Sequence, residues 1–482
     1  MKNNVQLLSH LNQAVVKNIR GFKLDAYLIA LEGWRRGLTL KWYKAESPIC
    51  TLDKVGSPVL GNFFSLSSSN NTHYFFRSRG DLVENKTVRL CSNKEKTKEI
   101  LSRKGISVPE GQVFNVMDNR ILEYSRKIGF PVVIKPKSGS MGKGVYTNIE
   151  SEKELKDCLS DYKSVYRYNE VIVEKHYEGN EYRIYVVGNK AIGATNRIPA
   201  NIIGDGEHNI SQLIELKNKE RKKNPYLAKK PIKPDYEVHQ LLNNSGFDMN
   251  SIPSKDQLVM LREKSNLSSG GDPIEATDEL SPEIRQLAVE ALRALPSIPH
   301  AGVDIIVNPD EKDKGVVLEI NGTAEIAFHV FPLRGNAINL PKAIIDYYFP
   351  EVKHVAPNYC YFDFNSVLEP LKSWATDELQ VTNNPIHDFH QKKFIVSGKI
   401  LKVGYMNWIK RQALRKGLHG HVKKIKGGKL EIIVFGNNEE KLIAFKDLCY
   451  KGSKQSEVTF VEELKVQNAN KPVVKIGFEI FT

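Results

Sequence analysis

The chain has 482 residues, of which 41% are hydrophobic and 26% are charged, and its formal net charge is +14. A chain of this length is expected to form two or three domains, and its apolar content is sufficient for buried cores. This composition is typical of a soluble globular protein and excludes a disordered or fibrous one.

The cysteines and the apolar runs exclude further classes. The five cysteines lie far apart and form no CxxC or Cys/His cluster, so neither a zinc site nor a disulfide framework is predicted. The opening residues, MKNNVQLLSH, lack the apolar core of a signal peptide, and no uncharged apolar run approaches the roughly 18 residues of a membrane helix. We therefore expect a cytoplasmic protein with no membrane partner.

Most of the net positive charge comes from the last fifth of the chain. Residues 385–482 hold 19 Lys and Arg against nine Asp and Glu. A surface for an anionic partner, such as nucleic acid or an acidic polymer, would explain this excess. A solvated lysine-rich surface would explain it too, because the lysines flank a Gly-Gly turn and form no stripe interleaved with aromatic residues. Both interpretations stay open.

The predicted elements indicate a mixed α/β fold. Residues 1–86 carry no recognisable motif. Beyond them we predict an amphipathic helix at 93–104, buried strands at 130–136 and 171–177, two strands around a turn at Gly188 and Asn189, a helix at 281–295, and strands at 301–307 and 315–322. Residues 204–262 are polar, lysine-rich and irregular, and resemble an excursion from the core. From Lys393 onward the pattern changes to a compact β/α mixture.

A glycine-rich loop follows the strand at 130–136 directly. Residues 139–144 contain three glycines, which allow the backbone to approach a ligand closely and to direct its amides at phosphate. The loop is not a Walker P-loop, and a flexible hairpin is the alternative interpretation. Lys135 favours a phosphate site, because an unpaired ammonium at the end of a buried strand would be costly without an anionic ligand.

Acidic residues mark the ends of several predicted strands. Asp304, Glu319 and Asn321 would place oxygen ligands of the kind that magnesium prefers near one another, although polar residues often lie at strand ends by chance. Glu174 ends one strand and Glu181 begins the next, where they could hold ribose hydroxyls or an adenine amine. Solvated turn residues are the simpler interpretation of these two glutamates.

Taken in order, these features resemble the ATP-grasp superfamily over about residues 90–350. The matching positions are Lys94, Lys135, the glycine loop, Glu174 with Lys175, Glu181, Asp304, Glu319 and Asn321. The resemblance is sharpest to the cyanophycin synthetase and bifunctional glutathione synthetase families. It rests there on the stretches RIPANIIGDGEHNISQLIELKN (197–218) and LREKSNLSSGGDPIEATDEL (261–280).

This resemblance implies a role for each matching residue. Lys94 and Lys135 would hold ATP phosphates beneath the glycine loop, which includes Gly139, Ser140, Met141, Gly142 and Gly144. Glu174 and the backbone near Tyr177 would read adenine, with Lys175 beside them, and Glu181 would hold ribose. Asp304, Glu319 and Asn321 would bind magnesium, and Arg183, Arg262 and Asn266 would face an acyl-phosphate.

The implied activity is that of a carboxylate–amine ligase. Such an enzyme uses ATP and two magnesium ions, with manganese as an alternative, and joins an amino acid or peptide carboxylate to an amine. The resemblance also implies a homo-oligomer. A non-catalytic ATP-binding protein that holds an anionic polymer with its basic tail is the competing interpretation. Relatives usually carry a Pro-Gly turn after the metal asparagine, whereas this chain reads Gly322-Thr323-Ala324-Glu325, so the substrate pocket is the least certain part.

The tail resembles a second family, acylphosphatase, over residues 394–436 and again at 476–480. Met406 and Lys424 stand at the positions of the family's arginine and asparagine, so the domain is expected to be degenerate. The expected layout is a region that precedes the ATP-grasp domain (1–88), the ATP-grasp domain (89–352) with a lid or substrate insertion at about 204–262, a linker (353–385), and an acylphosphatase-like, ferredoxin-like α/β sandwich (386–482).

Overall fold

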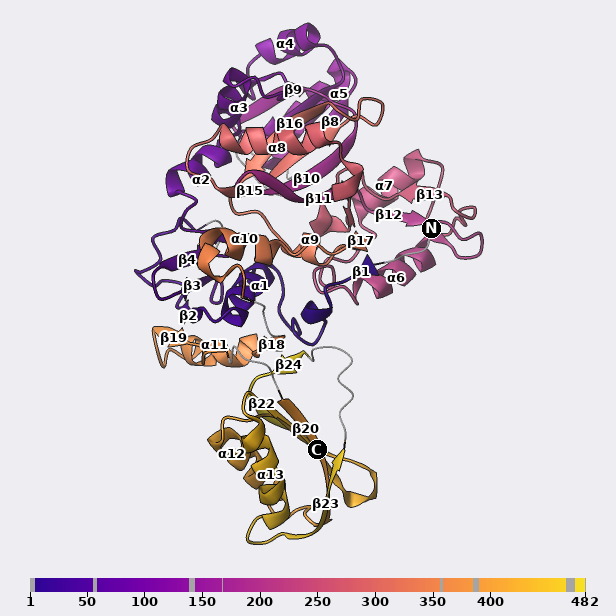
Figure 1. The fold of residues 1–482 in the computed structure, drawn as a ribbon. Coiled ribbons are helices and arrows are strands. Elements are labelled where there is room, and N and C mark those ends of the chain that lie inside the picture. Colours follow the sequence, from indigo (N-terminus) through magenta and orange to yellow (C-terminus); the bar gives the residue numbers. More distant parts are fainter. Residues whose placement is uncertain are drawn as a thin grey trace.

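The computed structural model describes residues 5–54, 59–137, 144–166, 168–355, 359–384, 390–464 and 473–481 (Figure 1). Its helices and strands form several mixed layers, so the predicted α/β class is confirmed. Within the described ranges, no helix has the length and apolar character that a membrane crossing requires.

The N-terminal region packs one buried helix against a five-stranded sheet. Helix α1 (Phe22–Arg35) is buried from Leu24 onward, where most of its residues are apolar, and three charged residues, Asp25, Glu32 and Arg35, are buried with them. The sheet has the order β19-β2-β3-β4-β5, and its strands are β2 (Thr39–Tyr43), β3 (Phe63–Ser67), β4 (Thr72–Phe76), β5 (Arg79–Gly80) and β19 (Glu378–Gln380). Strand β19 and helix α11 (Phe364–Lys372) come from the stretch expected to link the two domains, and they pack on this region.

A four-stranded sheet with the order β6-β9-β7-β8 follows. Its strands are β6 (Gly111–Asn115), β7 (Val132–Pro136), β8 (Tyr146–Ile149) and β9 (Glu170–Lys175). Helices α4 (Arg120–Ile128) and α5 (Glu152–Asp161) pack on this sheet, whereas α2 (Asn85–Ser92) and α3 (Lys94–Arg103) pack on β16 (Gly315–Asn321) of the next sheet. The side chain of Asn93 caps α3, and Gly105 adopts a φ of 76° just beyond the helix, as the predicted helix at 93–104 requires.

A second, five-stranded sheet has the order β14-β11-β10-β15-β16. Its strands are β10 (Asn180–Val187), β11 (Lys190–Ile198), β14 (Asp272–Glu275), β15 (His300–Val307) and β16 (Gly315–Asn321). Helix α8 (Pro282–Arg293) lies across this sheet (Figure 1) and buries its apolar face there. The strands and the helix predicted for this part of the sequence are therefore confirmed.

The insertion between β11 and β14 is ordered, so the prediction that residues 204–262 are irregular is wrong. It contains β12 (Asn201–Ile203), α6 (Ile210–Arg221), α7 (Tyr236–Asn244) and β13 (Leu258–Met260). Ile210, Leu213 and Ile214 lie on one face of α6 and contribute to a small core of their own. Lysines at 217, 219, 222 and 223 follow these three residues and make the segment look polar in the sequence.

The remaining elements join the parts of the chain. They are β1 (Val5–Gln6), α9 (Ala327–Val330), β17 (Gly335–Asn336), α10 (Leu340–Tyr348), β18 (Cys360–Tyr361) and β24 (Val474–Lys475). Strand β24 belongs to the C-terminal part of the chain and pairs with β18, so this pairing connects the C-terminal domain to the rest of the molecule.

The C-terminal domain is a sheet with two helices on one face (Figure 1). The strand order is β23-β20-β22-β21-β25. Its elements are β20 (His390–Lys399), α12 (Tyr405–Arg415), β21 (His419–Lys424), β22 (Leu430–Gly436), α13 (Glu439–Lys451), β23 (Glu457–Leu464) and β25 (Phe478–Phe481). This is the ferredoxin-like sandwich that the sequence predicts, and it has its own apolar core.

Candidate active site

Two neighbouring strands bring the three predicted metal ligands together. Asp304 on β15 lies directly opposite Glu319 on β16, and Asn321 follows two residues later on the same strand. The Nδ2 atom of Asn321 donates a hydrogen bond of 3.0 Å to Oε1 of Glu319. Residues two apart on a strand share a face, so the antiparallel register is the reason that these side chains meet.

Two arginines bind the Asp304 carboxylate. Arg183 lies opposite Asp304 on β10, and its Nη2 atom donates to Oδ2 of Asp304 at 2.6 Å. Arg197 on β11 donates to the same oxygen at 2.9 Å. Burial alone would raise the pKa of Asp304, but the two guanidiniums outweigh it and hold that pKa well below its usual range.

The sequence analysis missed Arg197. This residue also binds Glu181, whose other carboxylate oxygen accepts a hydrogen bond from the Ser265 hydroxyl. Arg197 is the first residue of the stretch at 197–218 on which the family resemblance rests, so a signal for it was present in the sequence. Arg183, which the sequence analysis did name, lies beside Asp304 and Glu319, two of the predicted metal ligands, and its role toward an acyl-phosphate stays a prediction.

The side-chain oxygens of Asp304, Glu319 and Asn321 suit a hard cation whose remaining ligands are phosphate oxygens. Among the described residues, no group of three or more His, Cys, Asp or Glu side chains is arranged to hold a metal. Glu319 and Asn321 nevertheless offer a carboxylate and an amide oxygen, and the Glu319 side chain is 33% exposed. Magnesium is usually held by one or two carboxylates together with substrate phosphates, so the residues fit this ion. Asp304 would have to share its carboxylate with the two arginines.

A second charged group lies on the other sheet, where Glu174 binds two lysines. The Lys135 Nζ atom lies 2.7 Å from Oε2 of Glu174, and Lys98 on α3 donates to Oε1. The sequence analysis missed Lys98, although it stands one helical turn after Lys94 and therefore on the same face of α3. Lys94 lies 3.9 Å from Glu319, between the two charged groups.

These lysines are buried and compete for too little negative charge. Burial, followed by repulsion from Lys135, lowers the pKa of Lys98 to about 7. Burial also lowers the pKa of Lys94. Although burial opposes it, attraction by Lys135 and Lys98 lowers the pKa of Glu174, so the carboxylate is ionised. A group with this excess of ammonium over carboxylate is a suitable site for a polyphosphate.

This group leads to a prediction about protons. Lys98 is already charged below pH 7, whereas at pH 8 most of it is neutral. A bound triphosphate should raise its pKa, so binding of magnesium–ATP at pH 8 should take up as much as about one proton. Calorimetry in two buffers with different ionisation enthalpies measures this uptake. It should disappear at pH 6 and in Lys98→Met but persist in the surface control Lys104→Met, and equal heats in both buffers at pH 8 would contradict it.

The other predicted residues have different surroundings. Unlike Arg183 and Arg197, which bind Asp304, Arg262 binds Asp235 and Glu237 of the insertion. The Asn266 side chain accepts a hydrogen bond from the Ser268 hydroxyl at 2.9 Å. The roles of Arg262 and Asn266 stay predictions.

The remaining nucleotide contacts also stay predictions. Lys175 is exposed and Tyr177 is half-buried just beyond the end of β9. Of the predicted glycine loop, Gly144 lies within the described residues and has a φ of 69°. Gly139, Ser140, Met141 and Gly142 lie outside the described residues.

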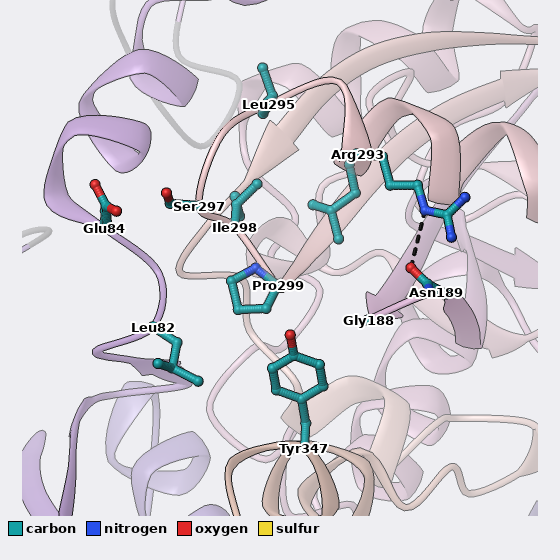
Figure 2. Close-up of a pocket in the computed structure, with 11 residues that line it drawn as sticks. Leu82, Glu84, Gly188, Asn189, Arg293, Leu295, Ser297, Ile298, Pro299 and Tyr347 are labelled. Carbon is teal, nitrogen blue, oxygen red and sulfur yellow. Dashed lines mark hydrogen bonds between the residues drawn. The ribbon is translucent and has the colours of Figure 1, made fainter.

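A separate pocket of about 450 Å³ lies away from these charged groups. Figure 2 shows it between the start of α2, the end of α8 and the turn after β10, with Tyr347 of α10 on another side. Arg293 donates to Oδ1 of Asn189 at 3.1 Å along its wall. Since none of the predicted site residues lines it, this pocket is not the candidate active site.

Comparisons with known proteins find two separate regions of similarity. A model of the RimK-like ATP-grasp domain matches residues 91–212, and a model of acylphosphatase matches residues 392–480. Cyanophycin synthetase from Trichormus variabilis is 35% identical over 273 residues, which are 55% of this chain and 30% of that protein. The glutathione biosynthesis bifunctional protein from Mannheimia succiniciproducens is 32% identical over 294 residues, which are 58% of this chain and 38% of the relative.

The chain thus spans about a third of the length of these curated relatives. Among solved structures, a bifunctional glutathione synthetase from Pasteurella multocida is 30% identical to this chain, with a TM-score of 0.47. The match covers 60% of this chain and 41% of the chain of that structure. The resemblance predicted from the sequence is confirmed: residues 91–212 are similar to the RimK-like ATP-grasp domain and residues 392–480 to acylphosphatase.

Proposed function

We propose that this protein is an ATP- and magnesium-dependent ligase that joins a carboxylate to an amine through an acyl-phosphate. The observation that carries the proposal is the charged group on β10, β15 and β16, in which Asp304, Glu319 and Asn321 lie beside Arg183. The names of the relatives describe synthesis of cyanophycin and of glutathione, which supports amino acids or peptides as substrates.

In this proposal the lysines bind and orient the phosphates of ATP. Lys94, Lys98 and Lys135 converge from α3 and β7, and Glu174 holds two of them in place. Their charges would stabilise the negative charge that develops as the terminal phosphoryl group moves. Little covalent chemistry by the protein is required, so positioning of the two substrates accounts for most of the expected rate acceleration.

The carboxylate substrate needs activation because oxide is a poor leaving group. Transfer of a phosphoryl group to the carboxylate oxygen gives an acyl-phosphate, from which an amine displaces phosphate. Arg183, held against Asp304, is placed to stabilise negative charge on the reacting oxygens. Magnesium held by Glu319, Asn321 and Asp304 would neutralise phosphate charge and act as a Lewis acid. Two such ions, or manganese in their place, are part of the proposal.

The test is a screen for ADP release over pairs of carboxylates and amines, followed by mass spectrometry of the product. A ligase consumes ATP only when its carboxylate is present. The competing function, a non-catalytic nucleotide-binding protein, predicts binding of ATP without any substrate-dependent ADP release. Arg183 lies beside the proposed magnesium ligands Asp304, Glu319 and Asn321. This arrangement favours the ligase, because simple nucleotide binding does not need it.

We expect the C-terminal domain to lack acylphosphatase activity. Met406 is partly buried against the core of the domain and offers no charge, whereas Lys424 is exposed at the end of β21 and offers no acceptor to orient a water. The measurement is hydrolysis of benzoyl phosphate by the full chain that also carries Glu319→Ala. The alternative is that a neighbouring lysine, Lys399 or Lys402, substitutes for the missing arginine. Hydrolysis well above the uncatalysed rate, lost on Lys402→Ala, would show this and contradict the expectation.

The net positive charge of the C-terminal domain suggests a different role for it. An anionic partner is the proposal, with a simple lysine-rich surface as the alternative. A cytoplasmic location and a homo-oligomeric state likewise remain proposals.

A further inference from the structure

A buried group of charged side chains lies beside the proposed active site, and we call it the Arg77 cluster. It joins four separate parts of the chain: helix α1, the turn between β4 and β5, the insertion, and the loop after β16. Its members are Asp25, Arg77, Tyr226, Lys230 and Glu325.

Arg77 is a buried cation without an ion-pair partner. It is 4% exposed, and among the described residues no carboxylate lies within 4.0 Å of its guanidinium. Its Nε atom is buried with no hydrogen-bond partner, and Cζ lies 3.2 Å from the centroid of the Phe22 ring. Its φ of 60° is unusual for a residue other than glycine. The charges of Asp25 and Glu325 act on Arg77, but neither carboxylate contacts it, so a bound anion would give this strained, buried cation the direct partner that it lacks.

Two carboxylates form the opposite side of the cluster. Oδ1 of Asp25 accepts hydrogen bonds from the backbone amides of Ile326 and Ala327, at 3.0 and 2.9 Å. Burial and the nearby charge of Glu325 raise the pKa of Asp25 to about 7. Such a pair of neighbouring carboxylates is stabilised by a cation between them.

Glu325 is held on its other side by the insertion. It accepts a hydrogen bond of 2.7 Å from the Tyr226 hydroxyl and lies 3.5 Å from Nζ of Lys230. Its side chain is 23% exposed, so solvent reaches the cluster. Two residues earlier, the Thr323 hydroxyl is buried and unpaired with any described residue.

The cluster adjoins the proposed reaction centre through Arg183. The Tyr226 hydroxyl binds Glu325, which directly follows Ala324 in the loop after β16. The loop after β16 also packs on Arg183, because a Cβ at Gly302 would lie 2.8 Å from Cβ of Ala324 and 2.9 Å from Cδ of Arg183. A substrate could therefore contact the cluster at one end and Arg183 at the other.

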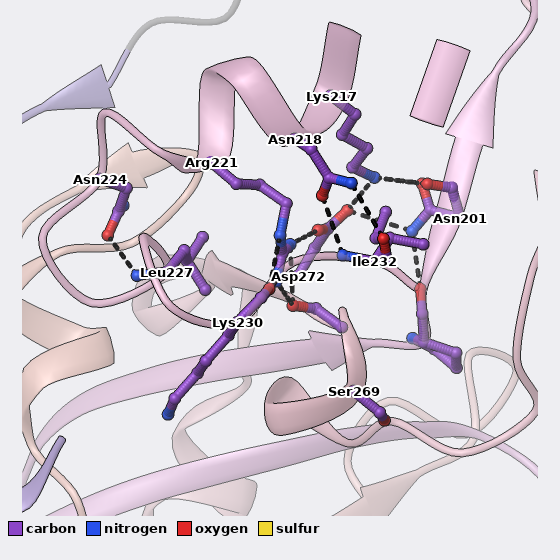
Figure 3. Close-up of polar contacts among 12 residues, drawn as sticks. Asn201, Lys217, Asn218, Arg221, Asn224, Leu227, Lys230, Ile232, Ser269 and Asp272 are labelled. Atoms are coloured by element: carbon purple, nitrogen blue, oxygen red, sulfur yellow. Dashed lines mark hydrogen bonds and ion pairs between the residues drawn. The ribbon is translucent and has the colours of Figure 1, made fainter. Parts of the chain in front are cut away.

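The insertion holds its side of the cluster rigidly. Arg221 donates to the backbone oxygen of Lys230, and Asn218 both donates to and accepts from the backbone of Ile232. Figure 3 shows the Lys230 side chain extending away from this network. Asn224 donates to the backbone oxygen of Phe331, which anchors the same segment to the chain just after α9. Tyr226 and Lys230 are thus positioned before any ligand binds.

We propose that the Arg77 cluster binds the α-amino acid end of the carboxylate substrate. Arg77 holds the α-carboxylate, the ammonium lies between Asp25 and Glu325, and the side-chain carboxylate reaches Arg183 for activation. The substrate class is therefore an acidic α-amino acid. This inference rests on the proposed function, and it adds a part of the molecule in which the sequence shows no motif.

The test uses the full chain with L-aspartate and L-glutamate as probes. Either amino acid should raise the melting temperature of the wild type and stimulate ADP release. Arg77→Met should weaken the apparent affinity about 10- to 100-fold, because a charge-assisted hydrogen bond is lost. Arg77→Lys should restore part of it, and the surface control Arg120→Met should change nothing. Glutarate, which lacks the ammonium, and 4-aminobutyrate, which lacks the α-carboxylate, should bind more weakly than L-glutamate.

The outcomes separate the two proposals. The effect of magnesium–ADP on the melting temperature is measured for every variant. If Arg77→Met does not fold, Lys230→Met and Glu325→Gln provide the same comparison. Two results would overturn the inference, provided that magnesium–ADP still binds. In the first, neither amino acid raises the melting temperature of the wild type. In the second, the amino acids raise the melting temperature of these variants as much as that of the wild type. Failure of the wild type to bind magnesium–ADP would instead overturn the proposed function.

Discussion

Replacing Glu319 with alanine is expected to reduce substrate-dependent ADP release by at least about 100-fold, because a single transition-state electrostatic contact is often worth this much. Glu319 is the most exposed of the acidic ligands on this sheet face and has Asn321 and Lys94 as neighbours. Its loss removes a carboxylate from a site with few protein ligands. Steady-state ADP release with the best substrate pair from the screen measures the effect.

Two controls define this result. Glu319→Gln keeps the shape of the side chain but removes its charge, so it should also be strongly impaired. Glu311→Gln removes a carboxylate that pairs with Lys314 at an exposed turn, and it should retain wild-type activity. Near wild-type ADP release by Glu319→Ala would show that the metal assignment is wrong.

The largest expected effect on stability is that of Asp272→Ala. Asp272 is buried on β14, where Nη1 of Arg221 lies 2.7 Å from Oδ1 and Nζ of Lys217 lies 2.5 Å from Oδ2 (Figure 3). Removing this carboxylate leaves two buried cations without their counter-ion. The expected loss is about 3–5 kcal/mol in the free energy of unfolding, which urea denaturation followed by circular dichroism measures.

A triple variant separates charge from packing. Asp272→Leu combined with Arg221→Met and Lys217→Met removes all three charges, so it should recover much of the lost stability. Asp278→Ala, in the exposed turn that follows β14, is the surface control and should change the free energy of unfolding by less than about 0.5 kcal/mol. If Asp272→Ala is as stable as this control, the buried ion pairs do not anchor the insertion.

The sequence predicts the elements that carry strong periodicity and clear ends. The helix at 93–104 has a capping residue, Asn93, and a terminating glycine, and the strands at 301–307 and 315–322 are apolar runs bounded by polar residues. The order of motifs from Lys94 to Asn321 also predicts which residues converge on β15 and β16. Local patterns suffice here because the contacts follow from strand register.

Other parts of the site depend on contacts between distant segments. Lys98 and Arg197 complete the two charged groups, and the sequence marks them only by position: Lys98 stands one helical turn after Lys94, and Arg197 opens the stretch at 197–218. The Arg77 cluster could not be predicted at all, since the packing of α1 brings Asp25 to the segment that includes Glu325 and α9, and a hydrogen bond from Ser78 to the Ala324 oxygen brings the Arg77 turn there. Charge in a sequence says nothing about which charges will be buried together.

The most direct test of the central claim follows an oxygen atom. The carboxylate substrate identified in the screen is labelled with oxygen-18 and converted to product with ATP and the amine. If the carboxylate attacks the terminal phosphate of ATP, one labelled oxygen must leave with the phosphate when the amine displaces it. The account predicts one oxygen-18 atom in each phosphate released, detected by mass spectrometry, and unlabelled phosphate would contradict it.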